Sequence, residues 1–109
     1  MAKINFQQLF DSLKKEVSEL AIATFKKQIK EAETDALNLL EKLKENLKDW
    51  TQQLSEGKLS KEDFEFLVLG QKELIEMVAL KQAGLAKIKI DKLKEDILNL
   101  LITTISGLI

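Results

Sequence analysis

The feature that most restricts the fold of this chain is how little it offers for reversing direction. Its 109 residues include no Pro and only four Gly, none of which comes before Gly57. A β-rich fold of this size would need many turns with the backbone angles that Gly and Pro favour. The sequence is instead rich in Leu, Lys, Glu, Ala and Gln, which are good helix formers. It therefore predicts an all-α fold in a single domain over residues 1–109.

One turn is well signalled, at residues 56–60. Gly57 can take the left-handed conformation that ends a helix, and Ser60 can accept a backbone N–H bond as the N-cap of the next helix. Glu62 and Asp63 then place two acids in the first helical turn, where the helix dipole favours them. Near the start of the chain, Asn5 is a candidate N-cap of the same kind.

Apolar residues recur at spacings of three or four on both sides of this turn, which is the pattern of amphipathic helices. They predict one helix over about 6–55 and a second over about 61–106, folded together as an antiparallel hairpin. The first helix would be roughly 75 Å long at about 1.5 Å per residue. The alternative is a compact single-chain bundle in which these helices break near Thr34 and Gly84.

The segment 96–109, DILNLLITTISGLI, holds more apolar residues than one stripe of a hairpin can bury. A helix that is apolar nearly all round is expected to have partners on several sides. The simplest partner is a second copy, so the sequence predicts that two hairpins dimerise into a four-helix bundle. The residues expected at this self-association interface are Phe6, Leu9, Phe10, Leu13, Met77, Leu80, Ile88, Leu98, Ile102, Ile105 and Ile109.

The charges nearly cancel overall but are unevenly distributed. Net charge is −1, and all 17 basic residues are Lys. The absence of Arg argues against sequence-specific nucleic-acid binding, because Lys lacks the bidentate fork of the guanidinium. Residues 56–76 hold six acids and three Lys, whereas residues 81–94 hold five Lys and one acid. The candidate patch for an anionic partner is Lys81, Lys87, Lys89, Lys92 and Lys94.

The sequence lacks two of the residue types most often used in catalysis and metal binding. It contains no His and no Cys, which removes the commonest general base at neutral pH, thiolate metal sites and cysteine nucleophiles. No glycine-rich phosphate loop is present. We therefore expect no enzyme, no cofactor and no metal site. The sequence favours a non-catalytic helical scaffold or protein-interaction module that forms homodimers or binds another helical protein.

The alternative function is binding to a membrane surface. Residues 97–109 would enter the lipid interface while the neighbouring Lys residues meet anionic headgroups. As a helix this segment spans only about 20 Å, which is short of a hydrocarbon core about 30 Å thick. The first residues do not resemble a signal peptide, so the expected location is the cytoplasm.

Overall fold

The computed structural model describes residues 5–26 and 30–108. These ranges contain no β-strand, so the all-α prediction is confirmed. Their helices are α1 (Phe6–Phe25), α2 (Lys30–Ser55), α3 (Lys61–Leu69), α4 (Val78–Gln82) and α5 (Lys87–Ser106).

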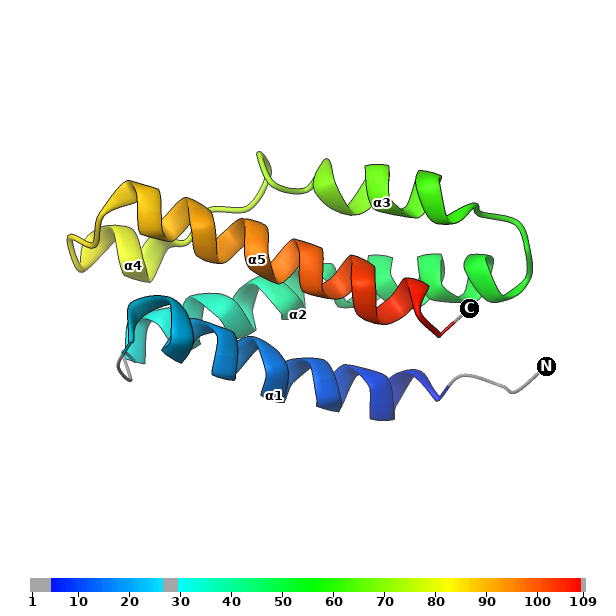
Figure 1. The fold of residues 1–109 in the computed structure, drawn as a ribbon, viewed down its shortest axis with the longest axis horizontal. Helices are drawn as coiled ribbons and strands as arrows, with labels where there is room; N and C mark the ends of the chain where they lie inside the picture. The colour runs from blue at the N-terminus through cyan, green and yellow to red at the C-terminus, as the bar shows by residue number, and fades with distance from the viewer. Residues whose placement is uncertain (1–4, 27–29, 109) are drawn as a thin grey trace.

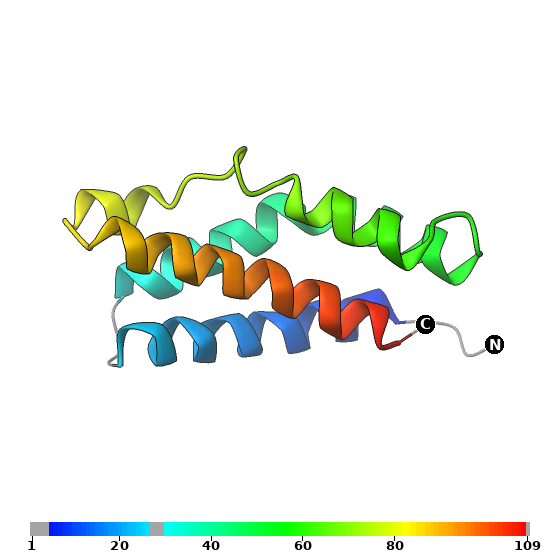
Figure 2. The ribbon, with the colours of Figure 1, turned by 45° about the horizontal axis from the view of Figure 1, so that its top comes forward.

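The helices form a four-legged bundle whose legs run alternately in opposite directions (Figures 1 and 2). The legs are α1, α2, the pair α3 and α4, and α5. The third leg is interrupted, because residues 70–77 separate α3 from α4. Each of α1 and the third leg packs against both α2 and α5. The bundle measures 45 × 24 × 19 Å.

The prediction of two uninterrupted helices is wrong. The first is divided after Phe25, where Lys26 takes a left-handed conformation with φ of 57°. The second is divided at residues 70–77 and again at residues 83–86. An unbroken helix of roughly 75 Å would exceed the 45 Å length of the bundle. Folding back buries four apolar faces of one chain against each other, which outweighs the roughly 1–2 kcal/mol that a left-handed Lys costs.

The compact single-chain bundle, stated above as the alternative, is closer to this structure. The break that this alternative placed near Gly84 is present: the φ of Gly84 is +78°, and Leu85 N–H donates to Leu80 O at 3.2 Å. The break that it placed near Thr34 is not present there, because Thr34 lies within α2. Local sequence favours a cap at Thr34, but in the structure α1 ends at Phe25 and α2 begins at Lys30.

The turn at 56–60 is confirmed in its details. Gly57 has a φ of +75°, and Lys58 N–H donates to Gln53 O at 2.9 Å in the pattern of a Schellman motif. The Ser60 hydroxyl then accepts the Asp63 N–H at 3.0 Å as the N-cap of α3. Asn5 caps α1 in the same way through the Gln8 N–H. Each of these capping contacts joins residues only a few positions apart, so the local sequence is enough to specify these helix ends.

A buried carboxylate fixes the start of α4. Asp35, in the second turn of α2, is only 6% exposed. It accepts hydrogen bonds from the Ala79 N–H at 3.1 Å and the Leu80 N–H at 2.7 Å. Both donors belong to the first turn of α4, which has no cap from its own sequence. Asp35 therefore acts as a helix cap supplied by another helix, 44 residues away in the chain.

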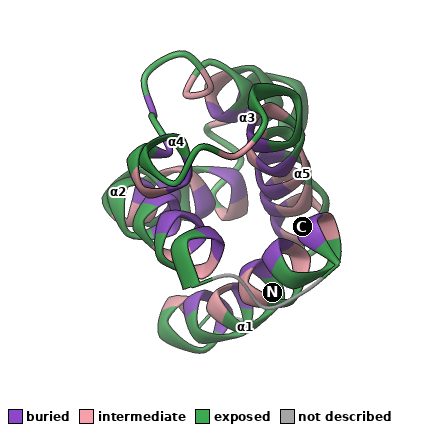
Figure 3. Cartoon of the chain, turned by 90° about the vertical axis from the view of Figure 1, so that its left-hand side faces the viewer, coloured by how far each residue is buried: buried purple, intermediate pink, exposed green. Residues whose placement is uncertain are grey.

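The core lies along the axis of the bundle, where the buried faces of all four legs meet (Figure 3). The apolar end of the chain belongs to it. Ile97, Leu98, Leu101 and Ile105 of α5 have no exposed surface. They are covered within the one chain, by the helices packed on α5. A second copy is therefore not needed to cover these four residues, although Leu108 beyond them is 52% exposed.

One buried hydroxyl in the described core has no hydrogen-bond partner, that of Thr51 on α2. An unsatisfied buried polar group costs about 1–3 kcal/mol. We therefore expect Thr51→Val, which keeps the side-chain shape, to raise the free energy of unfolding by about 1 kcal/mol in urea denaturation. Thr24→Val is the matched control, because the Thr24 hydroxyl donates to Leu20 O at 2.9 Å. A gain at Thr24 equal to that at Thr51 would contradict the explanation.

Candidate interaction surface

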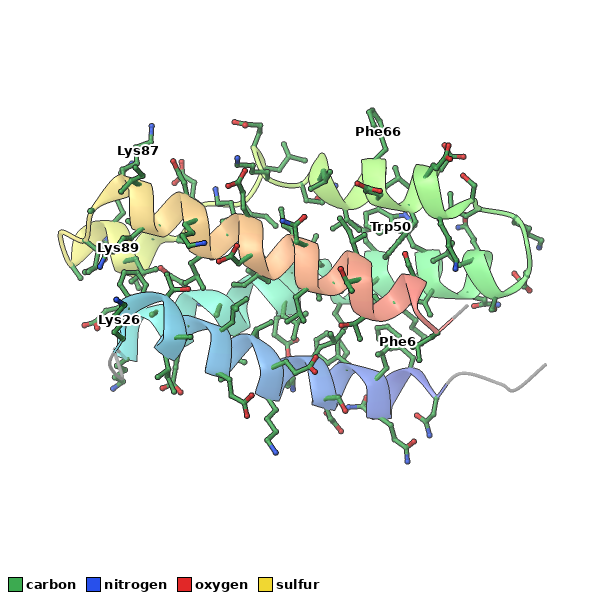
Figure 4. The ribbon with its side chains drawn as sticks, in the orientation of Figure 1. Phe6, Lys26, Trp50, Phe66, Lys87 and Lys89 are labelled. Atoms are coloured by element: carbon green, nitrogen blue, oxygen red, sulfur yellow. The ribbon has the colours of Figure 1, made fainter. Side chains whose placement is uncertain are left out.

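The third leg exposes large apolar side chains that the core does not use. Phe66 on α3 is 78% exposed and Leu74, in the segment between α3 and α4, is 74% exposed. Phe64 and Val68, the buried residues of α3, lie on the opposite side of the helix from Phe66. Figure 4 shows the Phe66 ring pointing away from the bundle, whereas Trp50 of α2 points toward α3. The Trp50 ring stacks edge-on against Phe64 at 6.3 Å, so it serves the core.

A third apolar side chain lies at the other end of the bundle. Ile88, in the first turn of α5, is 79% exposed. Val78 at the start of α4 is 46% exposed and Leu69 at the end of α3 is 41% exposed. Single exposed apolar residues are common on protein surfaces, but here four follow one another along the third leg and Ile88 comes next at the start of α5, which together indicate a contact site. We call Phe66, Leu69, Leu74, Val78 and Ile88 the outer apolar series.

The half of this edge that α3 occupies is acidic. Glu62, Asp63 and Glu65 are all exposed on α3, and Glu73 is exposed in the segment that follows. Glu62 lies one helical turn before Phe66, so its carboxylate flanks the ring on the same side of α3.

The opposite half is basic. Lys81 on α4 and Lys87 and Lys89 on α5 are exposed, and they lie at the end of the bundle where α4 turns into α5. Lys26, at the end of α1, lies at this end of the bundle too, below Lys89 and well below Lys87 in Figure 4. The fold thus gathers basic residues from two distant parts of the sequence at one end.

The candidate anionic-partner patch does not come together as one site. Lys92 pairs with Asp96 at 3.2 Å, and Lys94 is half-buried and donates to the backbone oxygen of Lys72 at 3.1 Å. The α4–α5 cleft, of about 390 Å³, is lined by Glu76, Met77, Lys81, Leu85, Lys87, Ile90, Asp91 and Lys94. Two carboxylates thus offset most of the charge of the three ammonium groups there, so the cleft is not a built anion site.

The residues expected at a self-association interface fall mostly in the core of the single chain. Phe10, Leu13, Leu80, Leu98 and Ile105 have no exposed surface. Leu9 and Met77 are also buried, and Phe6 and Ile102 are half-buried against the core. Ile88 alone among the described members is exposed, and Ile109 lies outside the described residues. The structure thus buries most of the residues expected at the interface within a single chain. Phe66 was not identified from the sequence as an exposed residue. The available signal was its position two residues after Phe64, which places it on the opposite side of α3 from the buried stripe.

An ion pair holds the segment 70–77 to α5. The Lys72 ammonium donates to the Glu95 carboxylate at 2.9 Å. This hydrogen bond, aided by the charge of Lys72, lowers the pKa of Glu95 below its ordinary value of 4.5. The same bond raises the pKa of Lys72 above 10.5, against the opposing effect of partial burial. The pair therefore stabilises the fold at pH values between the pKa of Glu95 and the pKa of Lys72. This stabilisation is lost as the pH falls through the pKa of Glu95 or rises through the pKa of Lys72.

This pair gives a pH prediction. In Lys72→Met the pKa of Glu95 should rise toward 4.5, because the donor and its charge are gone. Titration of the Glu95 side-chain carboxyl by NMR measures it directly. Lys48→Met removes an exposed Lys from α2 as the control and should leave the Glu95 pKa unchanged. An equal Glu95 pKa in wild type and Lys72→Met would show that the pair does not form in solution.

Neither a metal centre nor a membrane span is found in the parts of the chain that the structure describes. No three acidic side chains within residues 5–26 and 30–108 are placed to hold a metal ion. None of the described helices combines the length and the apolar character needed to cross a bilayer. The apolar side chains that a membrane-binding tail would use, among them Leu98, Leu101 and Ile105, are buried in the core.

The outer apolar series, with an acidic half and a basic half, is therefore the candidate functional surface of this chain. Comparison with known proteins adds no relative: no family model, no curated protein and no solved structure matches the chain.

Proposed function

We propose that this chain is a non-catalytic protein-interaction module that associates with itself through the outer apolar series. The observation that carries the proposal is the exposure of Phe66, Leu74 and Ile88, each at least 74% exposed, on a bundle whose core is already closed. Leaving large apolar side chains in water forfeits about 1.5–3 kcal/mol for each one that a partner could bury fully. Association covers them without disturbing the core.

The type of association differs from the one expected from sequence. Two hairpins that complete each other's core would depend on one another for folding. Here the single chain completes its own core, so association joins two folded units. A specific interface of standard size takes about 800 Å² from each partner. One side of a bundle 45 Å long and 24 Å wide is large enough to supply it.

A non-catalytic role agrees with the composition and the surface. The sequence has no His and no Cys. The acids Glu62, Asp63 and Glu65 are exposed side chains on one short helix. Asp35 is buried, but both of its hydrogen bonds are used to start α4. These groups support structure and surface charge, and we assign none of them to catalysis.

The test is the charge-inserting substitution Phe66→Glu. The wild-type chain should show a mass that rises with concentration in sedimentation equilibrium. Phe66→Glu should weaken self-association by about tenfold or more, because the contact loses a large apolar ring and a carboxylate must be desolvated in its place. Helix content by circular dichroism should stay unchanged, since Phe66 is 78% exposed.

The matched control is Ile22→Glu, which makes the same chemical change at an apolar residue of α1 that is 37% exposed and outside the outer apolar series. It should associate as the wild type does. A wild-type chain that stays monomeric up to high micromolar concentration contradicts self-association. Equal weakening by both variants contradicts the assignment to the outer apolar series.

A further inference from the structure

We infer that the occupant of this surface is a second copy of the chain, placed antiparallel about a two-fold axis, so that the acidic α3 half of each copy lies on the basic α5 start of the other. This inference rests on the self-association proposed above and adds the face, the orientation and the pairing. Two-fold dimers use the same patch on both copies, so the patch must be complementary to itself after a half-turn.

The charges on this surface meet that requirement. Glu62 and Glu65 both precede Phe66 on α3, by one helical turn and by one residue, and Lys87 and Lys89 are the sequence neighbours of Ile88 at the start of α5. α3 and the start of α5 lie toward opposite ends of the bundle, as Figure 1 shows. A half-turn exchanges these ends and brings acid onto base at two equivalent places. A parallel arrangement would bring like charges together, which is repulsive.

The apolar side chains follow the same symmetry. In the antiparallel arrangement Phe66 of one copy meets the partner's Ile88, and this contact occurs twice. Leu74 belongs to the segment between α3 and α4, which rises at the upper edge near the middle of the bundle in Figure 1. That position is close to the two-fold axis, so each Leu74 is placed to meet its own equivalent. The result is an apolar centre with a charged rim, which is the usual anatomy of a protein interface.

Self-complementarity is the reason to choose a second copy over an unrelated partner. The net charge of −1 gives no overall field that would select a partner by sign. The opposite charges are instead separated along the length of one chain, and a copy of that chain carries the matching arrangement. A partner of uniform charge would be attracted to one half of the surface and repelled by the other.

A charge-swap experiment tests this pairing with the full chain. One variant carries Glu62→Lys and Glu65→Lys, and we call it the α3 variant. The other carries Lys87→Glu and Lys89→Glu, and we call it the α5 variant. Each alone should self-associate about tenfold or more weakly than wild type, because both of its contact zones then carry one sign. An equimolar mixture should recover a dimer of near wild-type affinity, because both contact zones of the mixed dimer pair opposite charges.

The control separates this pairing from general attraction between oppositely charged proteins. A variant with Lys15→Glu on α1 and Lys48→Glu on α2 has the same net charge as the α5 variant, with both changes at exposed residues. Mixed with the α3 variant it should not restore the dimer. Circular dichroism confirms that each variant is folded, and sedimentation with one fluorescently labelled component measures the mixed dimer.

The outcomes distinguish the two proposals. Recovery with the α5 variant and none with the control supports the antiparallel dimer. Wild-type self-association without recovery in the mixture overturns the antiparallel pairing and leaves self-association standing. Equal recovery with the control variant overturns the pairing as well. A wild-type chain that remains monomeric overturns both proposals.

Discussion

Replacing Phe10 by Ala is expected to lower the free energy of unfolding by about 3–5 kcal/mol, the range measured for large aromatic residues removed from cores. The Phe10 side chain has no exposed surface and packs against the Phe6 ring at 5.8 Å. The ammonium groups of Lys14 and Lys44 lie 5.2 and 5.0 Å from the centre of its ring, so a cation–π contribution is lost as well. A domain of this size has a total stability of about 5–15 kcal/mol, so the loss is a large part of the whole.

This result shows whether Phe10 lies in the core of a single chain or at an interface between two copies. If Phe10 lay between two copies, its loss would dissociate a dimer and leave helical monomers. In the structure Phe10 belongs to the core of one chain, so its loss should shift the urea midpoint at every protein concentration. Phe66→Ala is the matched control, because the same atoms are removed from a side chain that is 78% exposed. Its effect on unfolding of the monomer should stay within about 0.5 kcal/mol.

The second large effect is expected at Asp35. Asp35→Ala should lower the free energy of unfolding by about 2–4 kcal/mol, because two hydrogen bonds to a charged acceptor are lost together. The first-turn N–H groups of α4, at Ala79 and Leu80, would be left without their partner. Urea denaturation measures the loss, and the amide signals of α4 should show the largest changes in an NMR spectrum.

Two further variants make the Asp35 result specific. Asp35→Asn keeps one acceptor oxygen at nearly the same shape and should lose about half as much as Asp35→Ala. Asp49→Ala removes an exposed carboxylate from the same helix and should have little effect. A small loss in Asp35→Ala, no greater than in Asp49→Ala, would show that α4 forms without this cap.

The parts of the fold that depend on neighbouring residues could be predicted from the sequence. The caps at Asn5 and Ser60 and the left-handed Gly57 all act within a few residues of their partners, so the pattern contains the whole interaction. The apolar stripe likewise identified buried positions such as Phe10 and Leu98. The caps depend on hydrogen bonds between residues close in sequence, and the buried stripe depends on apolar residues that recur at the helical spacing.

The parts that depend on distant contacts could not be predicted. Nothing in the sequence around Lys26 signals the end of a helix, and the chain turns there because α1 gains by packing back on α2 and α5. No local pattern marks Asp35 as different from the exposed acids of the sequence, whereas it is buried and caps a helix 44 residues further on. Whether an apolar face is covered by its own chain or by a copy is likewise a property of the whole fold. The interface expected from sequence therefore fell in the core.

The interrupted third leg has a consequence for motion. α3 has nine residues and α4 has five, and helices this short are not stable in water by themselves. When this leg separates from α2 and α5 it must also lose its helical hydrogen bonds, so its backbone amides should exchange with solvent through an opening smaller than global unfolding. A molecule bound to the outside of the leg would oppose that opening, and slowed amide exchange throughout α3 and α4, including residues that do not touch it, would report its binding.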